Sequence, residues 1–277
     1  MKTFRARITP ILDYILTHFT FLCLVFMKLQ FKFIKPDDRL KELKDKYAGK
    51  RCFIVGLGPS LTIEDLDLLK KSGEYTFSMN RCYQLFDKTE WRPDFYLISD
   101  AKACTTETME AIKSMLSDGI TIAYSRLEIN RFPRKAIYFK TNFIDFVLRN
   151  SKIDKYKKKS HFCRMSTDAY EYIYAGSSCV HSIIQIAYYM GFKDVYLLGT
   201  DCGVSGNRSY SNALKPQENN AYILGEGNLM IKDYESMRKD IEDKKLDFHV
   251  YNCSRGGFLE VFSRMELDDV LFFLPAR

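Results

Sequence analysis

The sequence has few of the features that mark a membrane-spanning, secreted or zinc-binding protein. Its longest unbroken apolar run, residues 19–27, is far shorter than the roughly 20 residues needed to cross a bilayer. The eight cysteines form no CxxC pair and no zinc-type cluster with the four histidines. No small-residue cleavage site follows the apolar run, so we expect no secretory signal. These absences predict a cytoplasmic protein whose cysteines are reduced and structural.

The composition is that of an ordinary folded protein with a surplus of positive charge. Apolar residues make up 46% of the 277 and charged residues 28%, so the chain can bury a sizeable core. The net charge of +7 favours anionic partners. Much of the surplus is local, in the lysine run at 155–159 and in the N-terminal segment. We therefore expect no nucleic-acid partner.

The N-terminal segment differs from the rest of the chain. Residues 11–33 are rich in Phe, Leu and Ile and are flanked by basic residues, among them Arg5, Arg7 and Lys35. This mixture is typical of an amphipathic helix lying in a membrane surface. The alternative is a helix packed on a partner or on the protein's own core. We predict a peripheral contact of residues 1–35 with the inner face of the cell membrane, within a helical segment spanning 1–48.

From residue 49 to residue 277, strand and helix patterns alternate, which predicts one Rossmann-like domain. Strands are expected at 52–55, 75–79, 95–99, 120–124, 136–139, 195–198 and 248–251, and helices at 62–69, 107–116, 178–190 and 229–245. Such alternation is typical of a mostly parallel sheet with helices on both faces. We therefore predict an α/β fold preceded by the N-terminal amphipathic segment. A charged helix is expected at 37–47 and a surface excursion at 141–168.

The clearest local motif is a glycine turn after the first predicted strand. In RCFIVGLGPSL, residues 51–61, a buried strand leads through Gly56 and Gly58 to Ser60 and then to an acidic helix start. Free backbone N–H groups and the positive end of a helix dipole meet at such a turn, where phosphate binds readily. The third glycine of the dinucleotide fingerprint and the Gly-Lys-Ser/Thr of a P-loop are missing. A simple tight turn is therefore the alternative.

Other polar residues fall at the ends of predicted strands or at a helix start. Because ligands in open α/β sheets bind outside the carboxyl ends of the strands, these residues together predict a nucleotide cleft. The candidate binding residues are Gly56, Gly58, Pro59, Ser60, Asn80, Asp100, Ser177, Ser178, Asn252, Ser254 and Arg255. Asn80 and Asp100 could hold a ribose or a base edge, and Arg255 could neutralise a leaving diphosphate. Each residue alone could instead be a cap or turn residue.

Three residues are candidates for the catalytic base. Asp201 follows the strand at 195–198 and is the carboxylate best placed to act as a base or to bind a metal. His181 lies within an apolar helix, where a buried core histidine is the competing interpretation. His161 could reach a site if its loop closes. No DxD pair follows a strand, so no metal site is predicted.

Five segments resemble a known family. GLGPSL, FSMNRC, PDFYLISDA, GSSCVHSIIQIAYYMGFKDVYLLGTD and VYNCSRGGFLEVFSR occur in this order between Lys50 and Leu271. They resemble the bacterial and archaeal family named after the archaeal 6-hydroxymethylpterin diphosphokinase. This family is related in fold to bacterial sialyltransferases that use CMP-sialic acid and to flagellin-glycosylation accessory factors, and the GLGPSL loop resembles that of the sialyltransferases.

The resemblance to the sialyltransferases implies that Gly58, Pro59, Ser60, Asn80, Asp100 and the Ser177–Ser178 turn contact a nucleotide. One departure matters. Those enzymes place a catalytic histidine after the Gly-x-Asp strand, whereas residues 202–245 contain no histidine. The base would then be another residue, such as Asp201, His161 or His181, or the chemistry differs.

These observations favour a transferase that takes a sugar from a CMP-type nucleotide donor and passes it to a surface glycan or lipid-linked acceptor. The alternative is a diphosphokinase that transfers diphosphate from ATP to a small hydroxymethyl acceptor, with Mg²⁺ held by Asp100 or Asp201. A third interpretation is a nucleotide-sugar-binding accessory protein that has lost its base. The donor sugar, the acceptor and the oligomeric state stay open.

Overall fold

The computed structural model describes residues 35–99, 103–125, 132–142, 162–203, 210–215 and 227–273, together with residues 19, 22 and 148. Most of the predicted N-terminal segment, as well as Asp100 and His161, lies outside these residues. Within the described ranges, no helix combines the length and the apolar character needed to cross a membrane.

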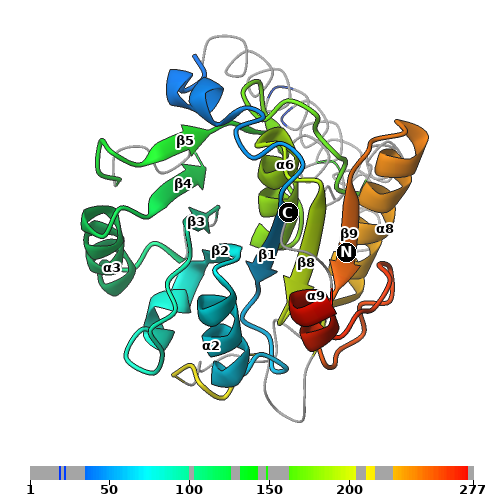
Figure 1. Cartoon of the computed structure of the whole chain (residues 1–277). Coiled ribbons are helices and arrows are strands. Elements are labelled where there is room, and N and C mark those ends of the chain that lie inside the picture. The colour runs from blue at the N-terminus through cyan, green and yellow to red at the C-terminus, as the bar shows by residue number, and fades with distance from the viewer. Residues whose placement is uncertain are drawn as a thin grey trace, which may run out of the picture.

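Strands and helices alternate along the described chain (Figure 1). The strands are β1 (Arg51–Val55), β2 (Tyr75–Met79), β3 (Phe95–Ile98), β4 (Thr121–Ser125), β5 (Ile137–Phe139), β6 (Thr141–Asn142), β7 (Ile173–Tyr174), β8 (Asp194–Leu198) and β9 (His249–Asn252). The α-helices are α2 (Ile63–Ser72), α3 (Thr106–Ser117), α6 (Cys179–Tyr189), α8 (Gly227–Asp243) and α9 (Leu267–Phe273), and η1 (Asp38–Leu43) and η2 (Asn80–Leu85) are 3-10 helices.

In the described part of the chain, seven strands form one sheet in the order β5-β4-β3-β2-β1-β8-β9, and β6 and β7 form a second, two-stranded sheet. Every strand pair is parallel. Parallel sheets need both faces covered, and β1 is buried along its whole length. The predicted α/β fold with a mostly parallel sheet is confirmed.

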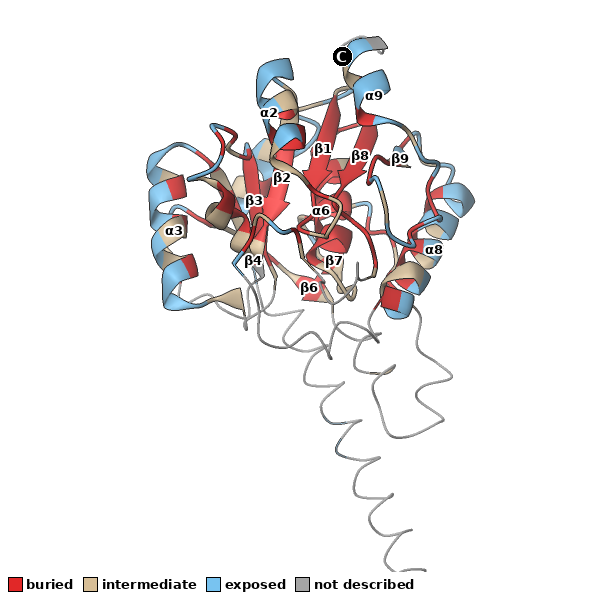
Figure 2. Ribbon diagram, turned by 90° about the horizontal axis from the view of Figure 1, so that it is seen from below, coloured by how far each residue is buried: buried red, intermediate tan, exposed pale blue. Residues whose placement is uncertain are grey.

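Helices cover both faces of the main sheet. Cys52 and Ile54 of β1 pack in the core cluster that includes α6 and α8, whereas Phe53 and Val55 pack in the cluster that includes α2, α3 and α9. This alternation follows from the two-residue period of a strand. Figure 2 shows α2 and α9 above the sheet and α6 below it.

The neighbouring strands β1 and β8 form the point where the direction of winding reverses. The chain leaves β1 through α2 on one face to reach β2, and it leaves β8 toward α8 on the other face to reach β9. The helices that follow β1 and β8 therefore lie on opposite faces of the sheet, and ligands of open α/β sheets bind outside the strand ends at such a switch point. The topology thus directs attention to the carboxyl ends of β1 and β8.

Residues 37–47 were predicted as one charged helix, and this prediction is wrong in extent. The helix is the short 3-10 element η1, and the chain then turns along the end of α6. The N–H groups of Asp45 and Tyr47 donate to the carbonyls of Tyr189 and Met190 at 3.1 and 2.8 Å. These long-range hydrogen bonds replace the ones that would have continued the helix.

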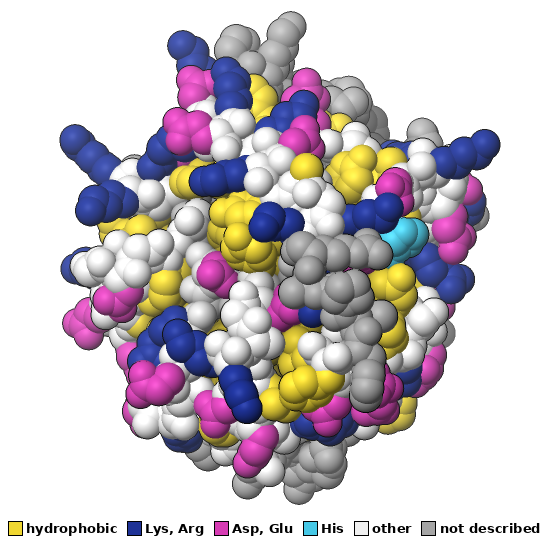
Figure 3. Space-filling model, in the orientation of Figure 1, with side chains coloured by type: hydrophobic (Ala, Val, Ile, Leu, Met, Phe, Trp, Pro, Cys, Tyr) yellow, Lys and Arg dark blue, Asp and Glu magenta, His cyan; other side chains and the backbone are white. Residues whose placement is uncertain are grey.

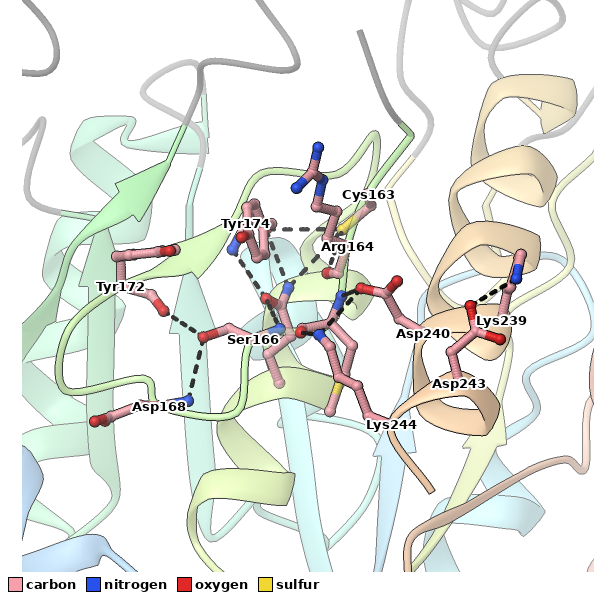
Figure 4. Close-up of polar contacts among 12 residues, drawn as sticks. Cys163, Arg164, Ser166, Asp168, Tyr172, Tyr174, Lys239, Asp240, Asp243 and Lys244 are labelled. Carbon is pink, nitrogen blue, oxygen red and sulfur yellow. Dashed lines mark hydrogen bonds and ion pairs between the residues drawn. The ribbon is translucent and has the colours of Figure 1, made fainter. Parts of the chain in front are cut away.

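The prediction of a surface excursion at 141–168 is wrong at the C-terminal end of this range. Cys163, Met165 and Ser166 are buried, and polar groups fasten this stretch to α6 and α8 (Figure 4). The Met165 N–H donates to Asp240 Oδ2 of α8 at 2.9 Å, and the Ser166 N–H donates to Gln185 Oε1 of α6 at 3.2 Å. The stretch is therefore part of the framework that holds α6 against α8.

Candidate functional site

The glycine turn after β1 packs backbone to backbone on the turn after β8. The Gly58 N–H donates to the Gly199 carbonyl at 2.8 Å, and a Cβ at Gly56 would lie 2.5 Å from that same oxygen. Gly199 itself has φ +56° and lies equally close to Gly56. Only glycine permits such a close approach of two backbone segments. The close contact between the turns therefore accounts for Gly56 and Gly199 without invoking a ligand.

The carboxylate of Asp201 fills the space beside this turn. The Ser60 N–H donates to Asp201 Oδ2 at 3.2 Å, and a Cβ at Gly58 would overlap the same oxygen. Asp201 is only 5% exposed. Burial raises its pKa above the ordinary aspartate value, against the lowering effect of hydrogen bonds from Ser60 and of the charge of Arg264. The Ser60 N–H, which we predicted to bind a phosphate, thus donates to a protein carboxylate.

The start of α2 likewise carries a carboxylate of its own. Thr62 caps the helix, and Asp65 completes the capping box by accepting the Thr62 N–H at 3.0 Å. The Arg255 guanidinium donates to Asp65 Oδ2 at 2.7 Å, and the two side chains are 47% and 2% exposed. Arg255 is therefore near the predicted cleft, but its guanidinium is paired with Asp65.

Asn252 and Ser254 are buried and build the loop that follows β9. The Asn252 amide donates to the Leu259 carbonyl at 2.7 Å, and its oxygen accepts the Ser254 N–H at 2.9 Å. The Ser254 hydroxyl in turn accepts the Thr200 N–H at 2.9 Å. These contacts tie the loop to the turn after β8. Both residues shape the site by positioning the loop.

A buried aspartate that the sequence analysis missed holds the start of α6. Both the N–H and the hydroxyl of Ser177 donate to Asp233 Oδ2, at 2.8 and 2.6 Å. Asp233 Oδ1 accepts the Cys163 N–H at 2.7 Å. Ser178 caps α6 by accepting the Val180 N–H at 3.2 Å. The only signal in the sequence was an aspartate next to the apolar positions Tyr234 and Met237 of α8.

Three side chains meet where β2 and β3 end and α6 begins. The Cys179 thiol lies 2.8 Å from the Ser99 hydroxyl and 3.6 Å from Asn80 Oδ1. Asn80 has φ +49°, and its backbone carbonyl accepts a hydrogen bond from the Tyr96 hydroxyl at 2.7 Å. The structure therefore places Asn80 in a polar cluster with Ser99 and Cys179, which the sequence analysis did not select. Asp100 follows Ser99 in the chain but lies outside the described residues.

His181 is enclosed in the core. Its ring stacks on Tyr234 at a centroid distance of 4.0 Å, and its Nδ1 lies 3.2 Å from the Ser178 carbonyl. The backbone of Gly176 covers the ring so closely that a Cβ there would lie 2.6 Å from His181 Cγ. His181 could meet a substrate only if this packing opened, and His161 lies outside the described residues. Of the two candidate bases among the described residues, the geometry therefore favours Asp201.

Elsewhere, charges on the described surface are mixed. A hollow of about 530 Å³ lies at the opposite, amino ends of β1, β8 and β9, lined in part by Asp45, Tyr188 and Lys193. Lys193 pairs there with Asp247 at 2.7 Å. On the face drawn in Figure 3, basic side chains alternate with acidic ones and form no single patch. Among the described residues, no three His, Cys, Asp or Glu side chains are grouped as metal ligands would be.

The fold and this geometry define a doubly wound α/β protein with a candidate site at the carboxyl ends of β1 and β8. The chain belongs to the family described as 6-hydroxymethylpterin diphosphokinase MptE-like, whose model matches residues 26–207. A comparison with curated proteins finds no match. Among solved structures, the chain is similar to the MAf glycosyltransferase from Magnetospirillum magneticum AMB-1, with 16% identity and a TM-score of 0.47. That match covers 84% of this chain and 36% of the other, so this chain spans about a third of the other protein's length.

Proposed function

We propose that the protein is a transferase that uses a nucleotide-activated donor and deprotonates an acceptor hydroxyl with Asp201. The observation that carries the proposal is a buried carboxylate of raised pKa at the switch point of a parallel sheet. A carboxylate whose pKa is raised by burial is a stronger base than an exposed one. Both the sugar transferase and the diphosphokinase predicted from the sequence need such a base.

The nucleotide would lie on the β1–β2–β3 side of Asp201. The Asn80 amide, the Ser99 hydroxyl and the first turn of α6 converge there. An amide and a hydroxyl can bond a ribose or a base edge, and the N–H groups at a helix start can bond phosphate. In this arrangement Ser178 and Asn80 keep the binding roles predicted for them, whereas Ser177 supports them through Asp233.

For a sugar donor, the reaction has one bond-forming and one bond-breaking event. The acceptor oxygen forms a bond to the anomeric carbon of the donor while the bond from that carbon to the phosphate oxygen breaks. Asp201 takes the proton of the acceptor hydroxyl, and CMP leaves with the bonding electron pair. The acceptor in this proposal is a surface glycan or a lipid-linked glycan. Residues 1–35 would hold the protein at the inner face of the membrane.

The family assignment favours a second candidate, a diphosphokinase. Here the acceptor oxygen attacks the β-phosphorus of ATP, AMP leaves, and Asp201 again accepts the proton. Mg²⁺ would neutralise the phosphates in this reaction. The two candidates share the base and differ in the donor, so a donor-binding measurement separates them.

A thermal-shift panel with CMP, UDP, GDP and ATP, each with and without Mg²⁺, tests the proposal. A ligand at about 100 times its Kd stabilises the native state by about 2.7 kcal/mol, which is easily measured. Stabilisation by CMP without metal supports the sugar transferase, and stabilisation by ATP only with Mg²⁺ supports the diphosphokinase. If no nucleotide raises the Tm, both are contradicted.

A pair of serine variants localises the binding. Ser99→Ala removes a hydroxyl from the Asn80–Ser99–Cys179 cluster and should weaken nucleotide binding about tenfold. Ser114→Ala, on the exposed side of α3, is the matched control and should leave binding unchanged. Equal affinities of the two variants would place the nucleotide elsewhere.

A further inference from the structure

Phe258 is a large aromatic side chain left in solvent beside the candidate site. Its side chain is 63% exposed, although it belongs to the loop that the buried Asn252 and Ser254 anchor. Figure 1 shows the loop after β9 near the edge where β8 ends. An exposed apolar ring in a rigidly held position suggests a binding role more strongly than one at a loose terminus.

The backbone of Phe258 is tied directly to Asp201. The Phe258 N–H donates to the Asp201 carbonyl at 2.7 Å. The preceding Gly257 has φ +82°, and a Cβ there would overlap the Asp201 backbone. Glycine at 257 is therefore required for the loop to approach the proposed base. Phe258 and Asp201 are held in a fixed relation to each other.

The ring itself is packed on one side and open on the other. A Cβ at Gly203 would overlap Phe258 Cδ2, so the ring rests against a residue without a side chain. The start of α8 is adjacent, because a Cβ at Gly227 would overlap the Cys202 carbonyl oxygen. A phenyl ring supported in this way presents apolar surface on which another ring can stack.

The place of Phe258 in the fold indicates which substrate contacts its phenyl ring. The proposed nucleotide contacts, Asn80 and the start of α6, lie on the β2–β3 side of Asp201. Phe258 lies on the β8–β9 side, against Gly203 and beside α8. Asp201 is between the two groups, as a base that transfers a proton from the acceptor should be.

We infer that Phe258 is the stacking platform for the acceptor, whose sugar ring lays its apolar C–H face on the phenyl ring beside Asp201. The inference rests on the proposed transferase function and assigns the acceptor side of the same site. Phe258 is in this account a binding residue that orients the acceptor hydroxyl toward the carboxylate, with no part in proton transfer.

Saturation-transfer NMR on the full chain tests the inference. The probes are lactose, N-acetylglucosamine, N-acetylgalactosamine and 6-hydroxymethylpterin, each added with saturating CMP. Phe258→Ala is compared with Phe258→Trp, which keeps an aromatic face, and with Phe272→Ala. Phe272 is the matched control because it is 64% exposed but belongs to α9.

We expect saturation transfer to the ring protons of at least one sugar in the wild type and in F272A, and its retention in F258W. In F258A the transfer should fall about tenfold, the effect of losing a stacking contact. Transfer to the pterin alone would overturn the assignment of a sugar acceptor to Phe258 and would select the diphosphokinase. No transfer to any probe in the wild type, equal transfer in F258A, or loss of the CMP signals in F258A would overturn the inference. Failure of the proposed function shows separately, as the absence of CMP signals in the wild type together with no stabilisation by CMP or ATP in the thermal-shift panel.

Discussion

Asp201 and Asp233 are two buried aspartates that perform similar local tasks in different regions. Each accepts a backbone N–H from the turn that precedes a helix, from Ser60 before α2 and from Ser177 before α6. Asp233 receives three donors at 2.6–2.8 Å spread over both oxygens. The Ser60 N–H reaches Asp201 at 3.2 Å, and burial raises the pKa of Asp201.

The difference indicates how each carboxylate is used. Three short hydrogen bonds to Asp233 hold the segments of Cys163 and Ser177 against α8. Asp201 lies where two glycine-containing turns meet, and burial is the largest influence on its pKa. We therefore treat the Asp233 region as framework and the Asp201 region as the reactive part of the proposed site.

The largest expected effect is on turnover by Asp201→Asn. Asparagine keeps an oxygen that can accept the Ser60 N–H but cannot take a proton, so we expect turnover to fall about 100-fold or more. The thermal midpoint should change little. Steady-state kinetics with the donor found in the thermal-shift panel measure the first effect, and calorimetry measures the second. Undiminished turnover would remove Asp201 as the base.

Asp233→Asn should show the opposite pattern. The asparagine NH₂ replaces one of the two accepting oxygens, so at least one N–H or O–H donor loses its acceptor. We expect a cost of about 2–3 kcal/mol in the free energy of unfolding. Urea denaturation measures the loss. Asp243→Asn on the same helix is the control, because its ion pair with Lys239 is exposed and should contribute much less to the free energy of unfolding. Equal losses would refute the framework role of Asp233.

The smallest expected effect is the pH dependence that the Asp201 carboxyl contributes to the free energy of unfolding. Because the folded-state pKa is raised, the native protein binds this proton more tightly than the unfolded chain. The stability contributed by the proton is therefore present at low pH and is lost as the pH rises through the folded-state pKa. The unfolding free energy of the wild type relative to Asp201→Asn should increase between about pH 7 and about pH 4. A pH-independent difference would contradict the raised pKa.

The same titration limits catalysis. The base works only as the carboxylate, so kcat/KM should decline as the pH falls through the raised pKa. The decline should begin at a higher pH than an unperturbed aspartate would give.

Much of the fold could be predicted from the sequence, because local patterns encode it. Apolar runs and helical spacing located β2 without error and placed α6 and α8 within about two residues, the usual disagreement at element ends. The 37–47 helix failed because its backbone bonds to the end of α6, which lies far away in sequence. The short helix α9 was missed, since seven residues carry little periodic signal.

The candidate site was less accessible to the sequence than the fold. The sequence predicted that the site lies at the strand ends. It also assigned the polar residues there to a ligand, whereas many of them form hydrogen bonds with other protein groups. Asn252, Ser254 and Arg255 bond protein groups, a fact that depends on long-range contacts. Asp233 was overlooked because a single aspartate in a helix has no distinguishing pattern. The role of Phe258 depends on exposure, which no local pattern reports.

The pairing of β1 with β8 has a consequence for how the protein is made. Arg51 pairs with Asp194, about 140 positions later in the chain, so one side of β1 has no partner until β8 has been synthesised. Contacts that close long loops form slowly, and an unpaired strand edge is prone to aggregation in the meantime. Because Asp201 lies just beyond β8, the chemistry of the site can be assembled only late in folding. A nascent chain ending before this strand would carry the glycine turn but not the proposed base.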